Sequence, residues 1–352
     1  MTTEGSRFWR EFITGMPKVE IHLHLEGAFT LSTLLTLIRK YGGDTSVQTV
    51  DDLQERFSYR DFARFIDTWK WKNQFFRRGQ DFELSAYQTL LDLRSQNVLF
   101  VEAFFSPWDF AENGIGMEEI AESVIAGCEQ ARKECGIGWR LIADINREHG
   151  PEEGMKRVDQ ICRFQRRGVV GIGLGGREVE YPAGLYKEVY AEAGRRGLLL
   201  TAHAGEAAGP ESIWAALDAL HVHRIGHGVR AQEDPLLVET LRQRHVPLEM
   251  CVSSNVRTGV VTTIAEHPIR RYLREGLNVT LNTDDPTMFG CRLTGEYLML
   301  LDDLDWEIRE IRTLSMNAVD ALSLDYAEKE SLRRRFEVAW DEAYSAYGKP
   351  IA

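Results

Sequence analysis

Short apolar runs alternate with longer amphipathic stretches along most of this chain. The runs are rich in Val, Ile, Leu and aromatic residues and are apolar at consecutive positions, which is typical of strands buried on both faces of a parallel sheet. Turn residues separate them from the neighbouring helical patterns. The predicted strands cover residues 18–23, 98–105, 139–145, 169–174, 198–202, 224–227, 246–251 and 278–284.

Helical periodicity fills the segments between these strands. Eight strands with helices between them predict a (β/α)8 barrel, also called a TIM barrel. The pattern alone leaves an open doubly wound sheet as the alternative. Helices are predicted most clearly over residues 117–133, 184–196, 234–244 and 264–275.

We expect one domain over residues 1–352, with two additions to a plain barrel. Residues 30–97, between the first two strands, look helical and are predicted to form an insertion or lid. Residues 306–347 are predicted to form additional C-terminal helices.

The insertion is rich in aromatic residues. Phe62, Phe65 and Trp69 repeat at helical spacing, which most often indicates packing against a core. The functional alternative is that part of this stripe roofs an apolar pocket.

Charge and cysteine content narrow the range of partners. The 352 residues include 42 Lys and Arg against 54 Asp and Glu, a net charge of −12, which argues against a nucleic-acid or anionic-membrane partner. The five cysteines form no C-x-x-C pair, as expected of reduced thiols. The chain shows neither the apolar run of a signal peptide nor the roughly 18 apolar residues of a membrane span. We therefore expect a cytoplasmic protein of undetermined oligomeric state.

Polar residues gather where the predicted strands end. Residues at the carboxyl ends of barrel strands converge on one mouth, where the active sites of such barrels lie. Three imidazoles and one carboxylate from this set would suit Zn²⁺, which lowers the pKa of a bound water toward about 7. Glu206 could then shuttle protons from its loop. The converging residues are His22, His24, His203, Glu206, His227, Asp284 and Asp285.

The remaining histidines lie elsewhere in the pattern. His221 and His223 precede the sixth strand, so a surface or capping role is expected. His149, His245 and His267 lie in connections, where solvated or capping roles are expected.

The segment GIGLGG, residues 171–176, matches the G-x-G-x-x-G pattern of dinucleotide-binding enzymes. Its first two glycines fall inside a strand, and no helix opens directly behind the third, because Pro182 intervenes. Close approach of the backbone to a flat ligand near Gly175 and Gly176 is the better interpretation.

Several motifs, in this order, resemble those of the adenosine deaminase family within the metal-dependent amidohydrolases. They span most of the chain, and the combination of HAGE, GHG and NTDDP is highly specific. The motifs are MPKVEIHLHLEG (16–27), GIGLGGRE (171–178), TAHAGE (201–206), RIGHG (224–228), CVSSNVRTG (251–259) and LNTDDP (281–286).

The resemblance implies a TIM barrel with one catalytic Zn²⁺ and a purine substrate. Glu206 would donate a proton to purine N1, and His227 would orient and deprotonate the attacking water. Asp285 would contact the water or N7, and Gly176 would donate its backbone N–H to N3. The implied metal ligands are His22, His24, His203 and Asp284, with His24 and Glu26 also among the substrate-binding residues.

Three departures from the family pattern concern the substrate. Adenosine-specific members usually have Asp at the position of Glu26, whereas adenine-using members tend to have Ser near Gly176. The motif CVSSN lacks the Pro that commonly follows its Cys. The main expectation is deamination of adenosine or a close analogue. The alternatives are adenine, or a 5′-modified adenosine such as methylthioadenosine or an aminofutalosine compound.

Hypotheses from other classes also remain open on the sequence. A metal-bound hydroxide could instead hydrolyse an amide or a phosphoester. A non-catalytic purine-binding protein would not need both a ligand set and a proton shuttle. A dinucleotide oxidoreductase would depend on the glycine motif alone.

Overall fold

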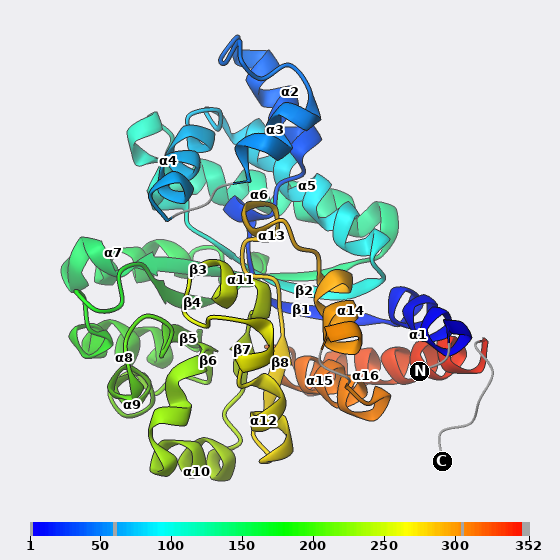
Figure 1. Cartoon of the computed structure of the whole chain (residues 1–352). Helices are drawn as coiled ribbons and strands as arrows, with labels where there is room; N and C mark the ends of the chain where they lie inside the picture. The colour runs from blue at the N-terminus through cyan, green and yellow to red at the C-terminus, as the bar shows by residue number, and fades with distance from the viewer. Residues whose placement is uncertain (1–2, 59–61, 304–305, 347–352) are drawn as a thin grey trace.

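Eight parallel strands form the centre of the molecule (Figure 1). The computed structural model describes residues 3–58, 62–303 and 306–346. Each strand pairs in parallel with the next in the chain, so the observed order is that of a (β/α)8 barrel, not of a doubly wound sheet. The strands are β1 (Lys18–His24), β2 (Val98–Phe105), β3 (Gly138–Asn146), β4 (Val169–Gly175), β5 (Leu199–Ala204), β6 (Arg224–His227), β7 (Leu248–Met250) and β8 (Val279–Leu281).

The barrel closes where the chain just after β8 meets β1. Asp284 donates its backbone N–H to the carbonyl of His22 over 2.9 Å, and its own carbonyl accepts from His24 N–H over 2.8 Å. A single bridge pairs Leu23 with Asp284. The predicted eighth strand, 278–284, is therefore too long, because its last residues leave the ladder with β7 to make this seam.

Helices surround the barrel, as predicted, although two of them are interrupted. The stretch 184–196 begins as a 3₁₀ turn before α8, and Pro268 separates a 3₁₀ turn from α12. Proline cannot donate the backbone hydrogen bond of a helix interior. The helices that follow β2 through β8 are α6 (Met117–Cys135), α7 (Gly150–Cys162), α8 (Lys187–Arg195), α9 (Pro210–Asp218), α10 (Pro235–Arg244), α11 (Val252–Arg257), α12 (Ile269–Arg274), α13 (Pro286–Phe289), α14 (Leu293–Asp303) and α15 (Ile308–Ala321).

In the described part of the chain four helices lie between β1 and β2, and the first three lie together at the top of Figure 1, whereas the fourth packs beside α6. They have clear start signals: Thr30 caps the first, and Thr49 forms a capping box with Asp52 at the second. The helices are α2 (Leu31–Tyr41), α3 (Val50–Arg56), α4 (Phe62–Asn73) and α5 (Gly79–Ser95).

The predicted aromatic stripe lies on α4. Trp69 lines the cavity described below and also packs against the hydrophobic core. The side chains of Phe62 and Phe65 lie outside the described part of the chain, so their role stays a prediction.

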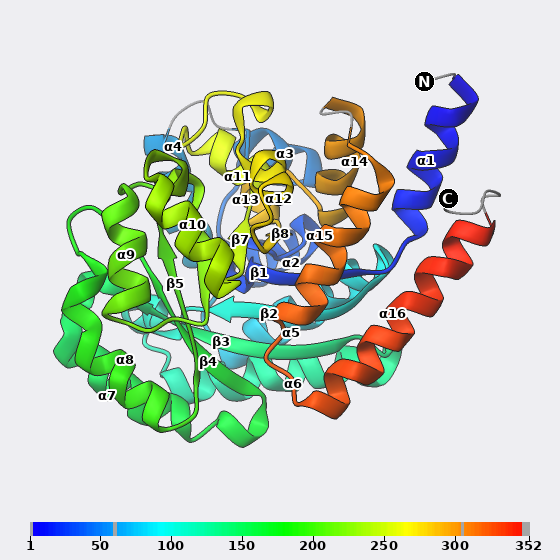
Figure 2. The same cartoon turned by 90° about the horizontal axis from the view of Figure 1, so that it is seen from below.

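The first helix, α1 (Thr3–Gly15), was not predicted and packs beside α16 (Tyr326–Ala346) (Figure 2). The rings of Phe12 and Trp340 meet edge to face, with centroids 5.0 Å apart. Within the described residues, no helix is both long enough and apolar enough to cross a membrane.

Candidate active site

A cavity of about 550 Å³ opens at the carboxyl ends of the strands. This volume is typical of small-molecule sites, and the position is where barrel enzymes bind substrates. A larger groove, about 730 Å³, lies at the opposite end of the barrel and contains none of the predicted site residues. The acidic residues that line the first cavity are Asp109, Asp144, Glu148, Glu178, Glu180, Glu206, Asp284 and Asp285.

The four predicted metal ligands come together at the base of this cavity. His24 Nε2 lies 3.2 Å from His203 Nε2 and 3.3 Å from Asp284 Oδ1, and His22 Nε2 lies 3.5 Å from the same oxygen. A tetrahedral ion about 2.0–2.1 Å from each ligand separates the ligand atoms by about 3.3–3.4 Å. The donor atoms are therefore spaced to hold one divalent cation such as Zn²⁺.

Electrostatics favour a cation at this cluster. Burial lowers the pKa of His24 to about 4 and places that of His203 well below its usual value, so both imidazoles are neutral donors. The carboxyl of Asp284 is buried, yet contacts with His22 and the neighbouring imidazoles hold its pKa well below the usual range. Neutral imidazoles beside an ionised carboxylate are a good ligand set for zinc.

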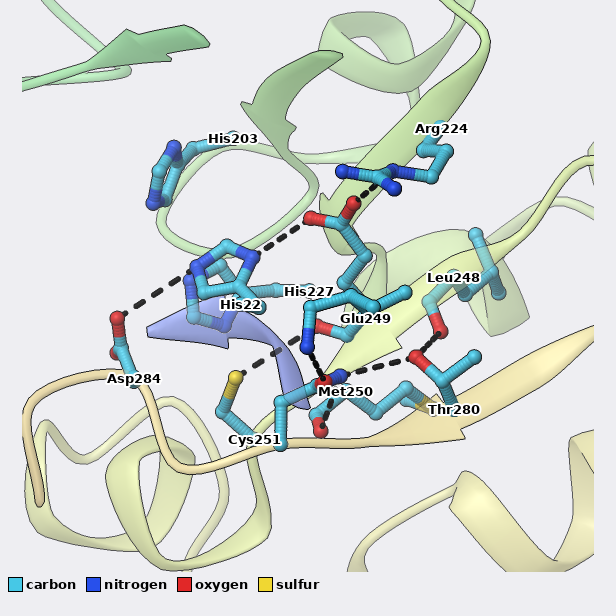
Figure 3. A network of polar contacts seen from close by, with 12 residues as sticks. His22, His203, Arg224, His227, Leu248, Glu249, Met250, Cys251, Thr280 and Asp284 are labelled. Carbon is cyan, nitrogen blue, oxygen red and sulfur yellow. Dashed lines mark hydrogen bonds and ion pairs between the residues drawn. The ribbon is translucent and has the colours of Figure 1, made fainter. Parts of the chain in front are cut away.

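A buried ionic network fixes the orientation of His22 (Figure 3). Glu249 Oε2 accepts a hydrogen bond from His22 Nδ1 over 2.7 Å, and its other oxygen lies 2.6 Å from Arg224 Nε. Arg224 also donates to Glu102 over 2.5 Å. With Nδ1 protonated, His22 Nε2 can bind a metal. Burial opposes a second proton, but Asp284 and Glu249 raise the pKa of His22 to about 10, so a metal would take the place of that proton on Nε2. Ser254 likewise donates to the second oxygen of Asp284 over 2.6 Å.

The backbone is strained at two of these residues. His227 and Asp284 have φ angles of 62° and 64°, in the left-handed region that non-glycine residues rarely occupy. Gly226 packs tightly here, because a Cβ on it would lie 2.9 Å from His22 Cε1. These features direct the side chains of His227 and Asp284 into the cavity.

Glu206 and His227 face each other across the site. Glu206 Oε2 lies 3.6 Å from His227 Nε2. Burial raises the pKa of Glu206, partly opposed by His227, which favours a carboxyl group able to donate a proton. The loop of Glu206 is held by Glu178, whose carboxylate accepts from the backbone N–H groups of residues 205–208 over 2.6–3.2 Å.

Asp285 and Gly176 also line the cavity. Asp285 Oδ1 is buried without a hydrogen-bond partner among the described residues, and burial together with Asp284 raises its pKa well above the usual value. Gly176 has a φ of 93°, which favours glycine. Within the preceding strand, a Cβ on Gly173 would lie 2.8 Å from the ring of Phe104, so this glycine serves close packing.

Glu26 is buried and is not among the residues that line the cavity. Its Oε1 accepts from the backbone N–H of Ser106 over 2.8 Å, whereas its Oε2 has no hydrogen-bond partner among the described residues. Burial raises its pKa to about 7, and nearby Lys72 on α4 opposes the shift. The structure thus links this carboxyl to the insertion, a connection that the sequence did not predict.

The remaining histidines lie outside the metal cluster. His267 is buried, not solvated, and it caps a helix end: its Nδ1 accepts from the backbone N–H of Ile269, the first residue of α12, over 3.3 Å, and its Nε2 contacts Asn255. His221 and His223 are exposed, as expected of surface residues, and His223 Nδ1 accepts from Leu200 N–H of β5 over 3.0 Å. His149 and His245 are exposed.

Comparisons with known proteins agree with this geometry. The adenosine deaminase family model matches residues 17–338. An adenine deaminase of Bordetella parapertussis is 36% identical over 88% of this chain and 98% of its own length. An aminodeoxyfutalosine deaminase of Streptomyces avermitilis is 34% identical over 96% of both chains. An amidohydrolase of Burkholderia ambifaria, solved with bound zinc, is 26% identical with a TM-score of 0.87 and covers 97% of this chain and 94% of its own.

Proposed function

Because the chain belongs to the adenosine deaminase family, we propose that it removes the C6 amino group of a 6-aminopurine by hydrolysis. The proposed substrate is adenine or an adenosine modified at its 5′ position. The observation that carries the proposal is the cluster of His22, His24, His203 and Asp284 beside Glu206 in one cavity. Relatives that deaminate both kinds of substrate support it.

One zinc ion is proposed as the cofactor. The four clustered ligands would hold it, and a bound zinc ion would lower the pKa of a water toward about 7. His22 and Asp284 are held ready by Glu249 and Ser254, respectively, so the site is organised by the protein itself.

The remaining residues would act on the purine. Glu206 would donate its proton to N1, which makes C6 accept the water oxygen as the C6–N6 bond weakens. Burial raises the pKa of Asp285, which favours a protonated carboxyl that would donate to N7. Gly176 N–H would meet N3. One hydrogen of the water restores the proton that Glu206 gave to N1, and the other leaves with ammonia, so the reaction balances. His227 would contact the attacking oxygen opposite Glu206.

The cavity supports a substrate larger than a base. At about 550 Å³ it could hold on the order of 18 waters, so a purine alone would leave much of it open. Acidic residues on its polar wall outnumber Arg177, which also lines it and pairs with Glu148 over 2.9 Å, so the wall disfavours a 5′-phosphate. Trp69 and Val260 supply apolar surface for a neutral substituent.

A substrate screen tests the proposal. The zinc-loaded protein would be mixed with adenine, adenosine, methylthioadenosine, aminofutalosine compounds and AMP, following absorbance near the adenine band and ammonia release. We expect turnover of adenine or a 5′-modified adenosine, weak turnover of AMP, and none with Glu206→Gln. If no 6-aminopurine is turned over, the proposal is wrong, and an amide or phosphoester hydrolase or a purine-binding protein would be the alternatives.

A further inference from the structure

His227 stands at the end of a buried chain of hydrogen bonds. The backbone N–H of Ile269 faces His267 Nδ1 at 3.3 Å, His267 Nε2 lies 3.2 Å from Asn255 Oδ1, and Asn255 Nδ2 lies 3.1 Å from His227 Nδ1. The side chains of His267, Asn255 and His227 are 5%, 0% and 1% exposed, so water has little access to them.

The direction of this chain follows from its first member. A backbone N–H can only donate, so His267 Nδ1 must accept and its Nε2 carries the proton. That proton requires an oxygen, which places Asn255 Oδ1 toward His267 and Asn255 Nδ2 toward His227. The reverse assignment would set two N–H groups against each other at His267 Nδ1.

We propose that Asn255 and His267 are positioning residues that fix the tautomer of His227. Asn255 donates to His227 Nδ1, so His227 presents an N–H, not a lone pair, from Nε2 toward Glu206. The inference rests on the proposed deaminase function, because it assigns the role of His227 in that reaction.

This assignment distinguishes His227 from its neighbour His22. Glu249 accepts from His22 Nδ1 and leaves the Nε2 lone pair free for a metal. Asn255 donates to His227 Nδ1 and leaves a proton on Nε2, so neither ring nitrogen of His227 has a free lone pair. Although His227, Cys251 and Asp284 also offer ligand atoms within 4.8 Å of one another, this set does not bind metal through His227.

The tautomer also changes the expected role of His227. A ring with Nε2–H donates a hydrogen bond to the attacking oxygen and orients it, but it cannot remove a proton through that atom. Glu206, 3.6 Å away, gives its proton to N1 and, once ionised, takes the proton of the attacking water. This proton transfer leaves Glu206 as it began and needs no further base.

Nitrogen-15 NMR of the histidine side chains tests the tautomer directly. The metal-free and zinc-loaded proteins would be compared, with the His227 signals identified by their loss in His227→Asn. We expect Nε2–H and an unprotonated Nδ1 in both forms. A His227 ring protonated at Nδ1 alone would overturn the proposal, whatever the activity.

Substitutions of Asn255 and His267 test whether these hydrogen bonds determine the tautomer of His227. In Asn255→Asp the carboxylate can only accept, so His227 should move its proton to Nδ1. We expect kcat to fall about 10²–10⁴-fold with little change in KM. His267→Gln keeps a donor for Asn255 Oδ1 and should retain kcat within about threefold, whereas His267→Leu should not.

A matched control separates this role from general loss of packing. Ser315→Ala removes a buried hydrogen bond to Tyr297 that is not part of the hydrogen-bond chain to His227. It should leave the His227 NMR spectrum and kcat unchanged. If Asn255→Asp leaves the His227 tautomer and kcat as they are, the proposal fails. If the tautomer is as expected and no aminopurine reacts, only the proposed function fails.

Discussion

Replacing Glu249 with Gln should weaken metal binding although Glu249 is not itself one of the proposed metal ligands. Glu249 is fully buried, and contacts with Arg224 and His22 lower its pKa in spite of burial, so it is ionised. Its charge makes His22 a stronger donor and fixes the ring so that Nε2 faces the cluster. A neutral amide keeps the shape but loses the charge, and it sets N–H groups against either Arg224 or His22.

The expected loss of zinc affinity follows from the effect of other residues that hydrogen-bond a metal-binding histidine. Loss of a group that orients a metal ligand typically weakens metal binding about 10–100-fold, which corresponds to about 1.4–2.7 kcal/mol. Breaking one contact of buried Arg224 also costs stability, so the two effects must be separated. Glu102→Gln provides the control, because Glu102 contacts Arg224 and backbone but no histidine of the cluster.

Zinc affinity would be measured by competition with a chelator of known affinity, and stability by thermal unfolding of the metal-free proteins. We expect both variants to unfold at a lower temperature, but only Glu249→Gln to bind zinc more weakly. Equal zinc affinities in the two variants would refute the role assigned to Glu249.

Three further predictions concern other parts of the structure. Gly226→Ala should reduce the metal content of the purified protein, because the new Cβ would lie 2.9 Å from His22 Cε1; unchanged content by elemental analysis would contradict this. Glu178→Gln should lower kcat about 10–10²-fold by displacing Glu206, which steady-state kinetics would detect, and unchanged kcat would show that the loop is held otherwise. Burial raises the pKa of Glu296 to about 7, so its contribution to stability is full below about pH 4.5 and is lost as pH rises through about 7. Glu296→Gln should therefore recover up to about 3 kcal/mol relative to the unsubstituted protein between pH 4.5 and 8, measured by denaturant unfolding, and parallel pH profiles would argue against it.

Much of the fold and the cluster could be predicted because both leave local signals. Apolar runs separated by helical patterns predicted the barrel, and its geometry then brought His22, His203 and Asp284 to one mouth. The helix α1 was missed because its charged and aromatic residues gain their meaning only from packing against α16.

The residues that support the site were harder to find. Glu249 lies within an apolar strand, and a charge in a strand buried on both faces must be paired, so Glu249 and Arg224 carried a usable signal. His267 and Asn255 carried none, because their meaning depends on a contact across α11 and the turn before α12. The positive φ angles of His227 and Asp284 could not be predicted either, since most Asp and His residues have negative φ although both types are enriched in the left-handed region.

The position of the metal cluster at the closure of the barrel gives the proposed cation a structural role as well. The bridge between Leu23 and Asp284 pairs β1 with the segment just after β8. Three of the four clustered side chains lie at or beside this bridge: His22, His24 and Asp284. An ion bound by all three would cross-link β1 to the segment that follows β8. Removal of the metal should therefore separate β1 from the segment after β8 before any other part of the barrel opens. Loss of the ion would then abolish catalysis and barrel closure together.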